Sequence, residues 1–426
     1  MALNDKSKIP GLAGPADAGS NPPDISGRMR LSQPRWLLTL IVLGAVGSSL
    51  LILKFASVPF FWLGIVWSTA LLAAIPFVRG SWPRAFLWNT VIVLILGASA
   101  EAYVAFHEYT PPTYPTPLFV PDDLLGWAPI KSHQAHGIKA NPRGLFHHPR
   151  GLLYDTTYTI DANGLRIAPP YREDQLAGTV LFFGCSFTFG DGLRDDETLP
   201  YQIGEQSAGR FRTFNFGFQG YSPAQMLTQL EQGIVARVVD TTPQYAFYLA
   251  IPTHVWRVAG RVSWNNRTSR YVLDLDGGVR QAGYWESRNP LAQRLGLNAH
   301  LEGQLRKSAL WQVLSNYDAP VNDDDIKLYF AMVRRAQDLL VAQYPGIKFH
   351  VILYPAMLGE PSRPVYEKLR DGFRQRGIPL TTVEDILPGY RSDRSSYVLS
   401  PQDAHPSAMG NRLLAQYVLR NVLPQP

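Results

Sequence analysis

Three long stretches without charged side chains follow one another near the N-terminus, and they constrain the fold of this chain more than any other feature. Trp36–Leu53 and Phe55–Val78 contain no charge, and Ala85–Phe106 is interrupted only by Asn89 and Glu101. A helix needs about 20 apolar residues to cross roughly 30 Å of hydrocarbon. We therefore predict three membrane-spanning helices. Their predicted bounds are about 36–54, 57–78 and 85–106.

The basic residues around these segments predict how the chain is oriented. Only Lys54 lies between the first and second segments. The others lie before the first segment or between the second and third: Arg28, Arg30, Arg35, Arg79 and Arg84. Basic residues stay on the cytoplasmic side. We therefore predict an integral protein of a bacterial inner membrane, with a disordered cytoplasmic tail at 1–35 and a periplasmic region after Phe106. Glu101, near the outer end of the third segment, is expected to reach the interface.

Composition excludes several classes of function. Charged residues make up 17% of the chain, below the roughly 25% of an ordinary soluble domain. The single cysteine, Cys185, excludes an intramolecular disulfide and any multi-cysteine metal site. His133, His136, His147 and His148 lie close together in sequence, but no helical or strand register brings them together. We predict no metal, no cofactor and, because no basic run is interleaved with aromatics, no nucleic-acid partner.

The rest of the chain reads as a linker with an irregular β-containing region at 107–178, followed by an α/β domain at 179–426. Short apolar runs alternate there with amphipathic segments, which predicts a parallel sheet covered on both faces. The predicted strands are 179–183, 211–216, 245–251, 347–353 and 378–383, and the predicted helices are 198–208, 223–239, 324–344, 365–377 and 407–423. An insertion occupies about 252–322. Ligands bind at the carboxyl ends of such strands, so function is expected in the loops there.

Two of these loops contain the side chains of nucleophilic catalysis. Ser186 follows the first predicted strand and opens toward a helix, where backbone N–H groups favour a developing oxyanion. Asp403 and His405 lie just before the last predicted helix. Serine becomes a good nucleophile when a histidine takes its proton and a carboxylate fixes the histidine tautomer. These three residues are therefore candidates for such a set.

Together, three blocks resemble the SGNH (GDSL-type) hydrolase family over about residues 179–426. They are G-x-S-x-x-x-G at Gly184–Gly190, N-x-G-x-x-G at Asn215–Gly220 and D-x-H-P-S at Asp403–Ser407. The resemblance implies a three-layer α/β/α, flavodoxin-like domain. It also implies that Ser186 is the nucleophile, His405 the base and Asp403 its partner. The N–H groups of Ser186 and Gly220 would contribute to an oxyanion hole.

The sequence departs from the family pattern at two positions. The third family block usually reads G-x-N-D, and here Thr253 stands where its asparagine would fall, so Thr253 or His254 would have to donate instead. The acid usually precedes the histidine by three residues rather than two. The two-residue spacing is similar to that of SGNH-like domains that acetylate alginate, which favours Asp403, with Asp393 as the alternative. Arg257 is a candidate for substrate binding.

The expected function is a membrane-anchored, extracytoplasmic serine ester hydrolase that acts through an acyl-enzyme on an O-acyl ester of a glycan or lipid. Two alternatives stay open. One is an O-acyltransferase that moves an acetyl group onto an exported polysaccharide. The other is a non-catalytic SGNH-like module that binds glycan in a membrane assembly. Three spans exceed what tethering requires, which leaves room for a partner protein within the bilayer.

Overall fold

A computed structural model of the 426-residue chain defines its architecture. The residues it describes are 35–55, 59–107, 112–140, 151–262, 265, 267–285, 295–297, 301, 304–305, 307–315, 320–355, 362–401 and 403–423. Residues 1–34 and 141–150, which include all but the last residue of the predicted tail and both His147 and His148, lie outside the described part.

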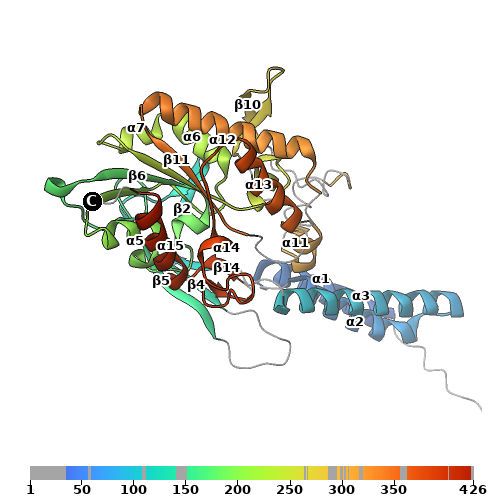
Figure 1. Ribbon diagram of the computed structural model, residues 1–426. Coiled ribbons are helices and arrows are strands. Elements are labelled where there is room, and N and C mark those ends of the chain that lie inside the picture. The colour runs from blue at the N-terminus through green and yellow to red at the C-terminus, as the bar shows by residue number, and fades with distance from the viewer. Residues whose placement is uncertain are drawn as a thin grey trace, which may run out of the picture.

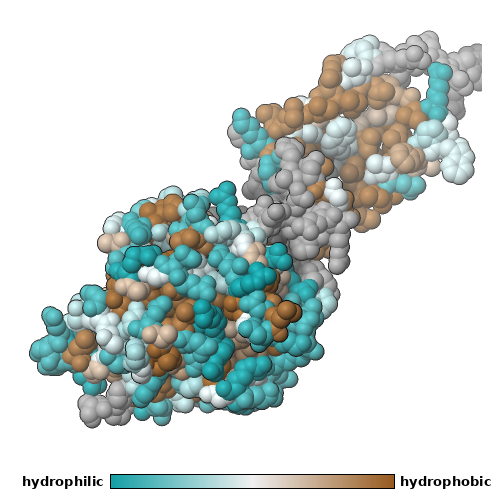
Figure 2. All heavy atoms as spheres, turned by 90° about the horizontal axis from the view of Figure 1, so that it is seen from above, coloured by the Kyte–Doolittle hydropathy of each residue, from teal (hydrophilic) through white to brown (hydrophobic). Residues whose placement is uncertain are grey.

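Three helices are long and apolar enough to cross a membrane. They are α1 (Arg35–Phe55), α2 (Pro59–Ala74) with the 3₁₀ turn Ile75–Phe77, and α3 (Ser81–His107). They pack side by side and project from one end of the globular part (Figure 1). Their visible surface is mostly apolar, with a few polar groups, unlike the evenly mixed surface of the globular part (Figure 2). Small residues let α2 and α3 approach closely, since a Cβ on Gly64 would lie 2.7 Å from the Cβ of Ala98.

A small antiparallel β region, here called the β module, follows α3. Its elements are β1 (Thr113–Thr116), β2 (Phe119–Asp122), β3 (Gly126–Pro129), β4 (His133–Ala140) and β5 (Leu152–Ile160). Strands β1, β4 and β5 form a sheet in that order, and β2 pairs with β3 as a hairpin. Buried and exposed residues alternate along β5, as expected for a strand with one face on a core. The module therefore packs one face onto the larger domain.

The larger domain is built on a five-stranded parallel sheet. Its strands are β6 (Gly178–Phe183), β7 (Phe211–Asn215), β8 (Tyr245–Ala250), β11 (Lys348–Leu353) and β12 (Leu380–Thr382). The spatial order β7-β6-β8-β11-β12 reverses direction between β6 and β8. This is the flavodoxin-like order, in which ligands bind where the order reverses. The predicted α/β class and strand arrangement are confirmed.

Helices cover both faces of this sheet (Figure 1). One apolar core joins Leu181 and Phe183 of β6 to α6 (Pro223–Glu231), α12 (Asp323–Gln343) and α13 (Arg363–Gln375). The other joins Val180 and Phe182 to α5 (Leu199–Gln206) and α15 (Ala408–Asn421). Alternate side chains of one strand thus enter opposite cores, because successive Cβ atoms point to opposite faces.

The sequence predicted one helix over 223–239, and the structure has two. Helix α6 ends before Gly233, and α7 (Ile234–Val238) begins after it. Gly233 has a φ of +64°, in the left-handed region that glycine adopts without steric cost. The remaining elements are α4 (Ser186–Phe189), α8 (Thr253–Val258), α11 (Ala309–Ser315), α14 (Val383–Ile386), β9 (Ser269–Leu273), β10 (Val279–Tyr284), β13 (Val398–Ser400) and β14 (Asp403–Pro406), with 3₁₀ turns Glu173–Gln175 and Asp195–Glu197.

Glu101 joins α3 to α11, a helix in the insertion that follows α8. Its carboxylate accepts hydrogen bonds from Ser308 Oγ at 2.7 Å and from the backbone N–H groups of Ala309 and Leu310 at 2.7 and 3.0 Å. These N–H groups begin α11, where a helix leaves its first donors unsatisfied. A buried carboxylate on α3 therefore has a structural role in docking α11.

Candidate active site

The structure brings Ser186, Asp403 and His405 together, although the sequence separates Ser186 from His405 by 219 positions. His405 Nε2 lies 2.7 Å from Ser186 Oγ, and His405 Nδ1 lies 2.5 Å from Asp403 Oδ1. With Nδ1–H donated to the carboxylate, Nε2 is left to accept the serine proton. Ser186 begins α4 directly after β6, and β14 carries the other two residues.

The turn before Ser186 requires glycine. Gly184 has a φ of +146°, and a Cβ there would lie 2.9 Å from the backbone oxygen of Leu249 on β8. The tight turn that follows places Ser186 at the edge where β6 and β8 end. Gly190, with a φ of +83°, then ends the single turn of α4. The glycine turns before and after Ser186, at Gly184 and Gly190, hold its hydroxyl at the edge of the sheet.

Arg166 fixes the segment that follows α4. Its guanidinium donates to the carbonyl oxygens of Phe189, Gly190 and Leu193 at 3.0, 2.6 and 2.5 Å. It also pairs with Asp195 at 2.9 Å. Burial lowers the pKa of Arg166, and the charge of Asp195 opposes this effect. This buried cation holds three turn carbonyls at once, so it keeps the Ser186 segment in one conformation.

Asp403 has partners on both carboxylate oxygens. Oδ1 faces His405, and Oδ2 accepts a hydrogen bond from Lys139 Nζ of the β module at 2.7 Å. The side chain of Asp403 is only 3% exposed. Burial works to raise the pKa of Asp403, but the hydrogen bond and charge of His405, followed by Lys139, outweigh it and hold that pKa well below its usual value. Asp403 is therefore ionised at neutral pH.

The β module also fixes the loop that contains Gly220. Trp127 Nε1 donates to the backbone oxygen of Gln219 at 2.8 Å, and Gln219 Nε2 donates to Asp191 Oδ1 at 2.7 Å. The C=O and N–H groups of a planar trans peptide point in opposite directions. The bond to Gln219 O therefore sets the direction of the Gly220 N–H. Within the described residues, neither this N–H nor that of Ser186 donates a hydrogen bond.

Asn215 of the second sequence block has a structural role. Its Nδ2 donates to Thr188 O at 2.9 Å, and its Oδ1 accepts from the N–H of Gly217 at 3.1 Å. The side chain thus links the end of β7 to α4. This link holds the loop of Gly220 next to the turn of Ser186.

The three candidates on α8 make no hydrogen bond to Ser186 or His405 in the described part of the chain. Thr253 is the first residue of α8. His254 is fully buried, with Nδ1 2.5 Å from Tyr248 Oη, and burial followed by the charge of Arg257 lowers its pKa well below the ordinary value. Arg257 donates to Tyr221 O at 2.7 Å.

The alternative acid and the two described histidines of the cluster make other contacts. Asp393 is exposed and accepts from the N–H of Ser395, while Asp403 occupies the position beside His405. His133 Nε2 contacts Pro117 O, and His136 Nε2 contacts Asp155. Among the described residues no group of three or more histidine, cysteine or carboxylate side chains lies together as metal ligands would.

Sequence reasoning missed Arg166, Lys139, Trp127 and Gln219. Each acts through a contact with a segment far away in the sequence or through a backbone atom. No local motif marks such a residue. Residues 118–178 were expected to shape an acceptor cleft, but no motif there pointed to these particular contacts.

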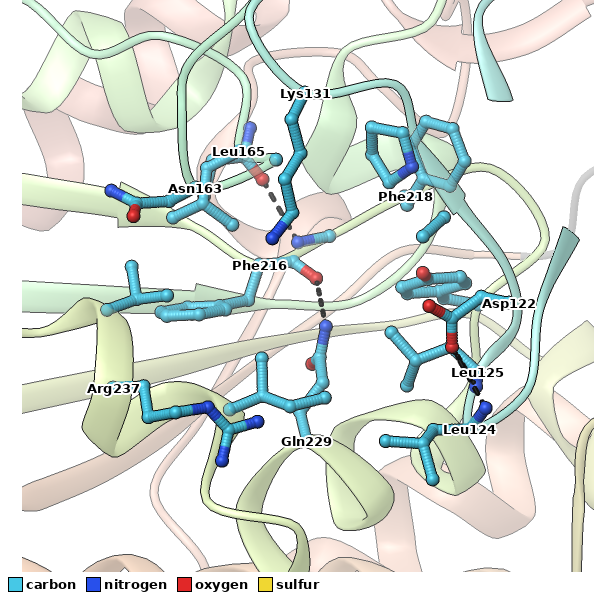
Figure 3. Close-up of a pocket in the computed structure, with 18 residues that line it drawn as sticks. Asp122, Leu124, Leu125, Lys131, Asn163, Leu165, Phe216, Phe218, Gln229 and Arg237 are labelled. Carbon is cyan, nitrogen blue, oxygen red and sulfur yellow. Dashed lines mark hydrogen bonds between the residues drawn. The ribbon is translucent and has the colours of Figure 1, made fainter. Parts of the chain in front are cut away.

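Two cavities lie near the loop of Gly220. One, of about 390 Å³, is bounded by Asn215–Phe218, with Lys131 pointing into it and Gln229 bonded to Phe216 O (Figure 3). Ser186, Asp403 and His405 do not line it. The other, of about 720 Å³, lies between the β module and the Gly220 loop, and it is called the hairpin cleft below. Its lining residues are Pro112, Tyr114, Phe119, Pro121, Gly126, Trp127, Gln219, Gly220, Arg257 and Arg267.

No family model matches the chain, and no curated protein matches it. Solved structures to which it is similar include a member of the lipolytic protein G-D-S-L family from Veillonella parvula, at 14% identity and a TM-score of 0.33 over 58% of this chain and 99% of that one. Another is the psychrotrophic esterase EstA from a Pseudoalteromonas species, at 9% identity and a TM-score of 0.30 over 57% of this chain and 96% of that one. A third is a carbohydrate acetylesterase family member from Sinorhizobium meliloti, at 10% identity and a TM-score of 0.30 over 57% of this chain and 95% of that one. At these identities and TM-scores, the likenesses assign no activity to this chain.

Proposed function

We propose that this protein is a membrane-anchored, extracytoplasmic serine ester hydrolase that acts through an acyl-enzyme. The observation that carries the proposal is the hydrogen-bonded series from Ser186 Oγ through His405 to an ionised Asp403. A buried carboxylate that orients a histidine, which in turn contacts a serine hydroxyl, is the arrangement that activates serine as a nucleophile.

The reaction proceeds in two halves. Ser186 Oγ attacks the ester carbonyl carbon while His405 Nε2 takes its proton, and the N–H groups of Ser186 and Gly220 stabilise the oxyanion. The C–O bond to the alcohol then breaks, and His405 returns the proton to the leaving alcohol. In the second half, water attacks the acyl carbon and gives a proton to His405. The acid leaves, and Ser186 Oγ regains its proton.

Placement outside the cytoplasm rests on the basic residues flanking the apolar helices. Arg79 lies in the connection between α2 and α3, and Arg84 lies in the first turn of α3. These two basic residues favour a cytoplasmic connection and an outer end for α3. The β module and the α/β domain follow α3 and would lie on the outer side.

An O-acyltransferase is the second candidate, because the hairpin cleft shares Gly220 with the proposed oxyanion hole and has room for an acceptor beside it. In that reaction a sugar hydroxyl replaces water in the second half. The chemistry at Ser186 is the same.

The test uses the full chain in detergent. We expect hydrolysis of nitrophenyl acetate and labelling by a fluorophosphonate, both abolished in Ser186→Ala. Ser395→Ala, which truncates an exposed serine outside the site, should keep both. Acyl release only after addition of a glycan acceptor would favour the transferase. A folded protein that neither hydrolyses the ester nor takes the label would contradict the proposal.

A further inference from the structure

We propose that the hairpin cleft binds an anionic sugar chain, and that this chain is what carries the ester cleaved at Ser186. The proposal names a substrate class for the proposed function and rests on it. A volume of about 720 Å³ lies within the range of ligand sites in proteins.

The cleft reaches the proposed oxyanion hole at Gly220, although Ser186, Asp403 and His405 do not line it. Gly220 lines the cleft, and its N–H is one of the proposed oxyanion donors. Asn215 links the loop of Gly220 to α4, which begins with Ser186. A chain lying in the cleft would therefore present substituents of its sugar rings toward Ser186.

The aromatic residues of the cleft offer carbon surface to a ligand. Tyr114 Oη accepts from Gln219 Nε2 at 2.6 Å, and Trp127 Nε1 donates to Gln219 O at 2.8 Å. The polar atoms of both rings are thus turned to the protein. Phe119 is 47% exposed and packs edge-on to Tyr114, with ring centroids 6.2 Å apart. Aromatic rings of this kind give large rigid contact area at low conformational cost, which suits the apolar faces of sugar rings.

The charge of the cleft selects an anion. Its lining includes Arg257 and Arg267 and no Asp or Glu. Arg267 is exposed and has a φ of +61°, a left-handed conformation that non-glycine residues rarely adopt. Such strained positions concentrate at ligand-binding sites. Guanidinium groups bind carboxylate or sulfate through paired hydrogen bonds, so sugar chains with either group fit the cleft.

The test measures binding by calorimetry with the full chain in detergent. We use Ser186→Ala as the host, so that binding is read separately from chemistry. The probes are hexagalacturonate, a sulfated cello-oligosaccharide, neutral cellohexaose and dihexanoyl phosphatidylglycerol. We expect an anionic probe to bind at least tenfold more tightly than cellohexaose and less tightly as salt rises. Whichever of the first two binds better identifies carboxylate or sulfate as the preferred group.

The variants locate the binding. Phe119→Ala should weaken binding of the anionic probe about tenfold. Arg267→Gln should remove most of the difference in affinity between the anionic probe and cellohexaose. Arg270→Gln removes an exposed arginine outside the cleft and should leave binding unchanged. Equal binding of charged and neutral chains, unchanged binding in both cleft variants, or binding of the lipid alone would overturn the proposal. If the glycan binds as expected but unmutated protein cleaves no ester, the proposed function fails while the cleft assignment stands.

Discussion

Lys139 Nζ lies 2.7 Å from Asp403 Oδ2, so a residue of the β module contacts the carboxylate that faces His405. The Lys139 side chain is 12% exposed and that of Asp403 is 3% exposed, so solvent screens this ion pair little. The β module and the α/β domain therefore form the site together, and Lys139 is a positioning residue that acts through Asp403.

Lys139→Met should lower kcat/KM for a small ester about tenfold. Loss of a hydrogen bond between charged groups costs about 1.5–3 kcal/mol, and about 1.4 kcal/mol corresponds to a factor of ten in rate. Lys139→Arg, which keeps the charge, should restore most of the activity. Steady-state kinetics on detergent-solubilised protein measures both. Equal activity of Lys139→Met and the unmutated protein would show that this contact does not support Asp403.

Asp403 should make stability depend on pH. Its pKa is lowered in the folded protein, so its ionised form contributes stability that is fully present above the pKa of the unfolded chain. That stability is lost as pH falls through the lower folded pKa. Asp403→Asn should therefore destabilise the fold more at pH 7 than at pH 3. Urea unfolding followed by tryptophan fluorescence measures the free energy of unfolding of both proteins at each pH. A loss of stability in Asp403→Asn that grows as pH falls would contradict this expectation.

Trp127→Phe should lower kcat by about three- to tenfold. The change keeps an aromatic ring but removes the donor to Gln219 O, and one hydrogen bond contributes about 0.5–1.5 kcal/mol. Gly220 N–H would then be less fixed when the oxyanion forms, while ground-state binding of a small ester changes little. Separate measurement of kcat and KM for Trp127→Phe and for the unmutated protein tests this prediction. A rise in KM with unchanged kcat would assign Trp127 to binding alone.

Arg166→Lys should destabilise the fold by about 3 kcal/mol, since breaking a buried charge network costs about that much or more. Lysine cannot reach the three carbonyl oxygens and Asp195 that the planar guanidinium contacts. Urea unfolding gives the free energy, and fluorophosphonate labelling at a urea concentration that keeps the protein folded reports the Ser186 turn. A variant as stable as the unmutated protein would contradict this role.

Glu101→Ala should loosen α11 without changing the chemistry. It removes the acceptor of three hydrogen bonds at residues 308–310. We expect proteolysis near α11 to become several-fold faster in nanodiscs, while hydrolysis of a small ester is unchanged. An unchanged cleavage rate would mean that Glu101 does not hold α11.

Local pattern was enough to predict the α/β class and most of its strands and helices. The apolar runs of β6 and β8 depend only on neighbouring residues, so a parallel sheet could be predicted from them. The flavodoxin-like strand order and the pairing of Ser186 with His405 were implied by the resemblance of the three sequence blocks to a known family. Gly233 was missed as a helix break, because glycine inside an apolar period also occurs in continuous helices. Lys139 and Trp127 could not be foreseen, because their partners, Asp403 and the carbonyl of Gln219, are remote in sequence and are set by the packing of the β module.

The proposed function depends above all on covalent acylation of Ser186. Mass spectrometry of peptides from the full chain, quenched in acid during turnover of an activated ester, tests it most directly. We expect an acyl adduct on Ser186 that disappears in His405→Ala and persists in Ser395→Ala. An adduct on another residue, or turnover during which Ser186 never carries an acyl group, would contradict this mechanism.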